Sequence, residues 1–76
     1  MKDRINRVFR DVFDDDSLQV RVEMSAKDLP SWDSLNHIKL VLALEREFDI
    51  RFTAQEIMNL NSVGDIEQML QVKGIT

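Results

Sequence analysis

The segment from residue 34 to residue 48 constrains the fold of this chain most strongly. Asp33 precedes it and is a preferred residue at a helix N-cap, and the turn Phe48-Asp49-Ile50 closes it. At about 100° per residue, one side of the segment gathers large apolar side chains below His37, namely Leu40, Val41, Leu44 and Phe48. The sequence therefore predicts a helix over 34–48 whose apolar stripe faces the core.

The opposite side of this segment is also apolar. Three apolar residues lie there with charged residues around them: Leu35, Ile38 and Leu42, bordered by Lys39, Glu45 and Arg46. A chain of 76 residues allows one domain with one small core, so it cannot easily bury both sides of one helix. We expect the second side to be a docking surface, apolar at its centre and charged at its rim. The alternative is that the long first loop covers it.

Amphipathic patterns predict a first and a last helix. The first spans 4–13, and its apolar stripe is Ile5, Val8, Phe9, Val12 and Phe13. Arg4, Arg7 and Arg10 lie off the centre of that stripe, where we expect a solvated flank. Ser62 caps the last helix and Gly74 stops it. The core face of this last helix is Val63, Ile66, Met69 and Leu70.

A third, short helix precedes the last one. Thr53 and Glu56 form a capping box, and the helix should run to about Leu60. The predicted fold class is therefore all-α: a four-helix bundle with a long first loop and a short third helix. We expect it to form a single domain over residues 1–76.

Residues 14–33 form the first loop. Asp14-Asp15-Asp16-Ser17 predicts a helix stop and a solvated acidic turn. Residues 18–24 alternate at the strand period, but no second run is available to pair with them. We therefore expect an extended loop, ended by Pro30, that four apolar side chains fix to the helices. These are Leu18, Val20, Val22 and Leu29.

Composition and charge exclude several classes of protein. Fourteen acidic against ten basic residues give a net charge of −4, which disfavours nucleic acid and suits a basic protein partner. The longest apolar run, residues 40–44, is far shorter than the roughly 20 residues that span a bilayer, and no apolar signal core begins the chain. We expect no membrane partner and a cytoplasmic location.

The same composition limits the chemistry. The absence of cysteine excludes a disulfide, a thiolate zinc site and a thiol nucleophile. Asp14 and Asp16 begin a pattern similar to an EF-hand loop, but Gln19 and Ser25 stand where that loop needs glycine and glutamate. We therefore expect no metal site.

Ser34 is the other informative residue, because it occupies the first helical position after Asp33. A helix N-terminus offers free backbone N–H groups and a partial positive charge, so a phosphate attached there is well tolerated. A serine at this place is also ordinary capping chemistry. A hydrolase that pairs Ser34 with His37 would need a third orienting group and an oxyanion hole, so we predict no catalytic residue and no enzyme.

Asp33-Ser34-Leu35, opening a helix that ends Leu44-Glu45-Arg46-Glu47-Phe48, resembles the acyl carrier protein family over nearly the whole chain. The resemblance implies that Ser34 carries 4′-phosphopantetheine, whose terminal thiol holds an acyl group as a thioester. It implies modification by a phosphopantetheinyl transferase, and then service to acylating and condensing or transferring enzymes. Leu35, Ile38, Lys39, Leu42 and Glu45 would meet these partners, with the carrier acting as a monomer.

Four positions depart from the pattern of fatty-acid carriers, which are strongly acidic along this helix. Asn36 stands where an aspartate is usual, Lys39 where a glutamate is usual, and Arg46 interrupts the acids. Trp32 stands where small residues are common. The resemblance therefore implies a carrier of a specialised, polyketide-like pathway. A peptidyl or aminoacyl carrier and an unmodified helical interaction domain remain as alternatives.

Overall fold

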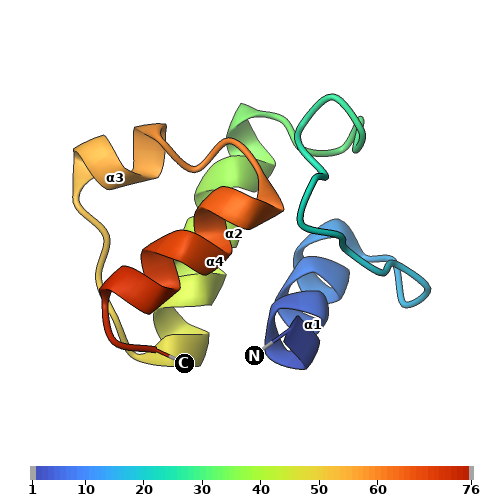
Figure 1. Ribbon diagram of the computed structural model, residues 1–76. Coiled ribbons are helices and arrows are strands. Elements are labelled where there is room, and N and C mark those ends of the chain that lie inside the picture. Colours follow the sequence, from blue (N-terminus) through green and yellow to red (C-terminus); the bar gives the residue numbers. More distant parts are fainter. Residues whose placement is uncertain (1, 76) are drawn as a thin grey trace.

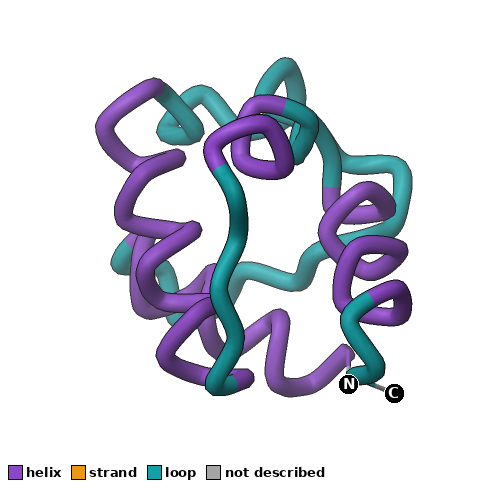
Figure 2. Tube along the Cα trace, turned by 90° about the vertical axis from the view of Figure 1, so that its left-hand side faces the viewer, coloured by secondary structure: helices purple, strands orange, loops and turns teal. Residues whose placement is uncertain are grey.

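Four helices follow one another in the computed structural model, which describes residues 2–75. They are α1 (Lys2–Phe13), α2 (Ser34–Phe48), α3 (Ala54–Met58) and α4 (Val63–Val72). Figure 1 shows α1 and α2 running in opposite directions, with α3 set apart from them. Loops make every connection between the helices (Figure 2). The predicted all-α fold with a long first loop and a short third helix is confirmed.

The core is built from the apolar stripes of the three long helices. In α1 and α4 the buried side chains are Ile5, Val8, Phe9, Val63, Ile66 and Leu70. In α2 they are the four residues of the predicted stripe, Leu40, Val41, Leu44 and Phe48. Val12, Phe13 and Met69 are half-buried at the margin of this cluster. The periodicity identifies these residues because a stripe of this width is the part of a helix that faces its neighbours.

Three helix ends share one conformation. A residue in the left-handed region follows α1, α2 and α4, namely Asp14 (φ 53°), Asp49 (φ 54°) and Gly74 (φ 87°). The next N–H group then bonds to a carbonyl five residues earlier in each case. Aspartate and glycine are among the residue types that tolerate this conformation, so the predicted stops fall where the sequence places them.

Two helix boundaries differ from prediction. The first helix begins at Lys2 rather than residue 4, with Asp3 in its first turn, where an acidic side chain favours the helix dipole. The third ends at Met58 rather than near Leu60. The N–H groups of Asn59 and Leu60 bond to carbonyls three residues earlier, which tightens the final turn and ends the helix.

Two of the three arginines of α1 make specific contacts with other parts of the protein. Arg4 Nε lies 2.8 Å from the carboxylate of Glu47, and its guanidinium lies over the Phe48 ring. Hydrogen bonding to Arg4 lowers the pKa of Glu47 below its usual value. Arg10 donates to the carbonyl of Leu18 at 2.6 Å. Arg4 and Arg7 are exposed as predicted, although Arg4 is also paired, whereas Arg10 is half-buried and the prediction was wrong for it.

The long loop is held largely through its backbone. The N–H groups of Val63 and Gly64 donate to the carbonyls of Met24 and Val22, each at 2.9 Å, where α4 begins. The predicted extended segment therefore does pair through its backbone, but its partner is the start of α4 and not a second strand. Val20 is buried, and Leu18 and Leu29 are half-buried, as predicted. Val22 was predicted to pack inward but is 51% exposed, so the prediction was wrong for this side chain, although the Val22 carbonyl attaches the loop to α4.

Asn6 provides a further attachment of this loop to α1. Its Oδ1 accepts a hydrogen bond from the Val20 N–H at 2.8 Å, in a partly buried setting. Asn6→Ala leaves that donor without a partner, so we expect a loss of about 1–2 kcal/mol in the free energy of unfolding, measured by urea denaturation. Asn6→Asp keeps the acceptor and should retain most of the stability. Equal stability of Asn6→Ala and the native chain would contradict this role.

Candidate functional site

Ser34 is the first residue of α2 and is exposed. Asp33 is the N-cap, as predicted: its Oδ1 accepts from the Asn36 N–H at 2.9 Å, and its carbonyl accepts from His37 N–H. Within residues 2–75 the Ser34 hydroxyl and the N–H groups of Ser34 and Leu35 have no hydrogen-bond partner. The helix start therefore presents a hydroxyl beside two open backbone donors, a suitable setting for a phosphate anion.

The turn before Ser34 is fixed by Asn36. The Nδ2 group of Asn36 donates to the carbonyl of Ser31 at 2.6 Å, and the Trp32 N–H donates to the carbonyl of Leu29 at 2.8 Å. An aspartate in place of Asn36 could not donate this hydrogen bond. The asparagine thus holds the end of the loop against the first turn of α2.

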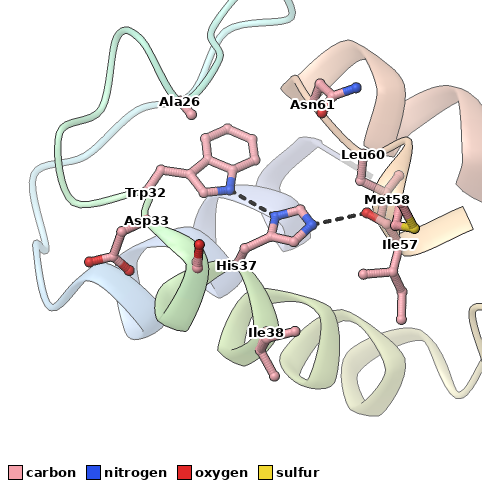
Figure 3. A pocket seen from close by; sticks show the side chains of 10 residues that line it. Ala26, Trp32, Asp33, His37, Ile38, Ile57, Met58, Leu60 and Asn61 are labelled. Atoms are coloured by element: carbon pink, nitrogen blue, oxygen red, sulfur yellow. Dashed lines mark hydrogen bonds between the residues drawn. The ribbon is translucent and has the colours of Figure 1, made fainter. Parts of the chain in front are cut away.

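Trp32, His37 and Ile57 form a chain of hydrogen bonds beside Ser34 (Figure 3). Trp32 Nε1 donates to His37 Nδ1 at 3.0 Å, and His37 Nε2 lies 3.0 Å from the carbonyl of Ile57. Because Nδ1 accepts, Nε2 carries the proton and donates to Ile57. Both ring nitrogens are therefore used within the fold. The structure gives no support to a serine–histidine hydrolase, since neither nitrogen bonds to Ser34.

The same tryptophan is part of the core. Its ring is buried, meets Phe9 edge to face at 5.5 Å between centroids, and lies near Phe13. On its other side its N–H edge faces the His37 ring, which is nearly coplanar with it at an interplanar angle of 20°. Trp32 therefore joins α1, the loop and α2, and the hydrogen-bond chain extends this connection to the carbonyl end of α3.

The short α3 is fixed at its start and by α4. Thr53 and Glu56 form the predicted capping box. Lys73, after the last helix, pairs with Glu56 at 3.0 Å and lies over the Phe52 ring. The Thr53 N–H bond, followed by the Lys73 bond, lowers the pKa of Glu56 below its usual value. These contacts position a helix of only five residues that has no buried side chain of its own.

A cleft of about 680 Å³ opens between the start of α2, the loop and α3 (Figure 3). Ser34, Trp32 and His37 line it on one side, and Ile57, Met58 and Leu60 on the other. Ile57 and Met58 are not among the residues that the sequence predicts for the site. The sequence offered little indication of their role, because a helix of five residues is too short to show an apolar periodicity.

The second side of α2 is exposed. Leu35, Ile38 and Leu42 are 65%, 51% and 55% exposed, so the loop does not cover them. Lys39 is exposed beside them. Glu45 is half-buried, and its Oε2 accepts from the Phe52 N–H at 2.8 Å, so one of its oxygens holds the connection between α2 and α3.

None of the helices in residues 2–75 has the length and apolar character needed to cross a membrane.

Comparison with known proteins identifies the family. The sequence profile described as "Phosphopantetheine attachment site" matches residues 4–70. The acyl carrier protein of Clostridium acetobutylicum is 33% identical over 64 residues, which cover 84% of this chain and 83% of that protein. The chain belongs to the acyl carrier protein family.

Further relatives of the acyl carrier protein family agree. The acyl carrier protein of Bdellovibrio bacteriovorus is 36% identical over 74% of this chain and 72% of its own length. The solved structure of the holo acyl carrier protein of Geobacter metallireducens matches with a TM-score of 0.85 and 41% identity, over 93% of this chain and 82% of that chain. Members of the family carry covalently attached 4′-phosphopantetheine and are carriers rather than enzymes. They work with phosphopantetheinyl transferases and biosynthetic enzymes.

The hydrogen bond between Trp32 and His37 can be tested by substitution. Trp32→Phe keeps an aromatic ring but removes the donor, so we expect the free energy of unfolding to fall by about 1–2 kcal/mol. In a His37→Ala background the same change should cost less, because the acceptor is already absent. Equal losses in both backgrounds, measured by urea denaturation, would contradict the bond.

Proposed function

We propose that this acyl carrier protein bears its 4′-phosphopantetheine on Ser34. The observation that carries the proposal is the exposed Ser34 hydroxyl, free of bonds within residues 2–75, at a helix start with two open N–H donors. Asp33 sets this geometry by capping α2. The residues present therefore fit a phosphodiester at this position, because backbone donors and the helix dipole both favour its negative charge.

When phosphopantetheine is attached, this protein acts as the acceptor. The Ser34 oxygen forms a bond to the phosphorus of coenzyme A that bears pantetheine, while the bond from that phosphorus to adenosine 3′,5′-bisphosphate breaks. The hydroxyl proton passes to a base of the transferase. When bound, the group supplies a thiol that holds an acyl chain as a thioester. The carrier itself holds the attachment point rigidly, since the cap and the Trp32–His37 chain fix both sides of Ser34.

We also propose that Leu35, Ile38, Lys39 and Leu42 form the face that partner enzymes contact, with Glu45 at its edge. Their exposure supports this, because a small domain rarely leaves a contiguous apolar patch open without use. The patch begins next to Ser34, so an enzyme that docks there reaches the attached group. We propose that the carrier acts as a monomer in the cytoplasm, where coenzyme A is available.

We further propose that the pathway is a specialised, polyketide-like one. Asn36 is used to hold Ser31, and Lys39 and Arg46 are exposed where fatty-acid carriers bear acids. These features separate the recognition helix from that of primary fatty-acid carriers. A peptidyl or aminoacyl cargo is the alternative, since those carriers share the fold and the serine.

Loading of Ser34 is tested by intact mass. After incubation with coenzyme A and a broad-specificity phosphopantetheinyl transferase, the native chain should gain one phosphopantetheine. Ser34→Ala should gain none, and Ser31→Ala, which removes an exposed hydroxyl three residues away, should gain one. An unmodified native chain with several competent transferases would indicate an unmodified interaction domain instead.

The docking face is tested with the same transferase. Leu35→Ala and Ile38→Ala remove exposed apolar surface, so the circular dichroism should stay native while kcat/KM for loading falls about three- to tenfold. Val72→Ala is the matched control, because Val72 is 74% exposed on α4. Loss of helical signal in the α2 variants would show that these side chains belong to the core. Equal rates in all three variants would remove the docking role.

A further inference from the structure

Apolar and basic side chains alternate along one ridge of α2. Leu35, Lys39, Leu42 and Arg46 are spaced at i, i+4, i+7 and i+11, which places them in a single row on a helix. All four are exposed. At 1.5 Å per residue, the two leucines are about 10 Å apart along the axis, and so are the two cations. The outermost part of the docking face is therefore a regular pattern of two apolar and two basic groups.

Three acids on or next to α2 accept hydrogen bonds within the fold, whereas the ridge cations make no such contact. Asp33 accepts from the Asn36 N–H, Glu45 from the Phe52 N–H, and Glu47 from Arg4. Asp49, the C-cap of α2, is exposed and makes no side-chain hydrogen bond or salt bridge within residues 2–75. Within residues 2–75 neither Lys39 nor Arg46 takes part in a salt bridge or a side-chain hydrogen bond. The available charges along the ridge from Leu35 to Arg46 are consequently positive, although the chain as a whole carries −4.

A second cleft extends the ridge at the end of α2. It measures about 390 Å³, and its lining residues are Leu42, Glu45, Arg46, Asp49, Ile50 and Arg51. Arg51 is exposed and likewise has no salt bridge in the described part of the chain. It adds a third available cation and a further apolar contact. Arg51 thus places a second available guanidinium beside Arg46, while Glu45 and Asp49 balance the charge of the cleft lining.

We propose that the ridge recognises an acidic protein surface, with carboxylates facing Lys39 and Arg46 and apolar pockets receiving Leu35 and Leu42. This proposal rests on the proposed function and names the partner chemistry of its docking face. Charge complementarity supports it, because opposite charges at a rim steer association and exclude wrong partners. The two leucines favour a protein over a nucleic acid, whose backbone binds mainly through cations and offers no matching apolar pockets.

The test uses the holo chain and a pair of enzymes. One is a malonyl transferase of primary fatty-acid synthesis with a basic carrier-binding patch. The other is the same enzyme with two patch cations replaced by glutamate. We measure kcat/KM for malonyl transfer and expect the native chain to favour the acidic enzyme about five- to tenfold, from two exposed charge pairs. Lys39→Glu/Arg46→Glu should reverse the preference, and Lys39→Gln/Arg46→Gln should abolish it.

The control separates local from total charge. Arg7→Glu/Arg21→Glu makes the same change in net charge, from −4 to −8, on α1 and in the loop, and should keep the native preference. Circular dichroism checks that each variant is folded. If Ser34 does not accept phosphopantetheine, the proposed function fails before malonyl transfer is measured. The intact mass of the protein detects that failure independently of the transfer rates.

Once the holo chain has been obtained, two results would overturn the proposal of an acidic partner surface. One is an equal rate with both enzymes, or no transfer by either. The other is binding of the native chain to phosphatidylglycerol-containing vesicles, lost in Lys39→Glu/Arg46→Glu, with no preference between the enzymes. That second result would assign the ridge to an anionic membrane.

Discussion

The hydrogen-bond chain from Trp32 through His37 to Ile57 connects the parts of the molecule that surround Ser34. The indole is buried against Phe9 of α1, the imidazole belongs to α2, and the final acceptor belongs to α3. A five-residue helix without buried side chains would not hold its position by packing alone. The cleft next to the attachment point therefore depends on these two hydrogen bonds and one aromatic cluster, together with the capping box and the Lys73–Glu56 pair that position α3.

Small size explains the division of α2 into two faces. A core large enough for one stripe takes Leu40, Val41, Leu44 and Phe48, and no segment within residues 2–75 covers Leu35, Ile38 and Leu42. The charges follow the same division. Asp33 and Glu45 bond to backbone N–H groups and Glu47 bonds to Arg4, while Lys39 and Arg46 project from the uncovered side. Net charge alone is therefore a poor guide to the partner of this carrier.

The sequence predicted the helices, their core stripes and the exposure of the second face of α2, because each follows from local periodicity and capping. It also placed Ser34 beside its cap. It did not predict that Trp32 is in the core, since a single aromatic residue in a loop has no period. The pairing of Arg4 with Glu47 and the attachment of the loop through the carbonyls of Val22 and Met24 were also missed, because they join segments far apart in the chain. The bond from Arg10 to Leu18 was missed because it depends on how the loop folds back against α1. Such contacts leave no local pattern.

The central claim is that this domain borrows its reactive group and holds it on Ser34. The most direct measurement is tandem mass spectrometry of the protein purified from its native host, with the fragment containing Ser34 isolated and its attached group released. We predict a phosphopantetheine on that serine, with an acyl or aminoacyl cargo whose mass identifies the pathway. A Ser34 fragment that is wholly unmodified, or a phosphopantetheine located on another residue, would contradict the claim.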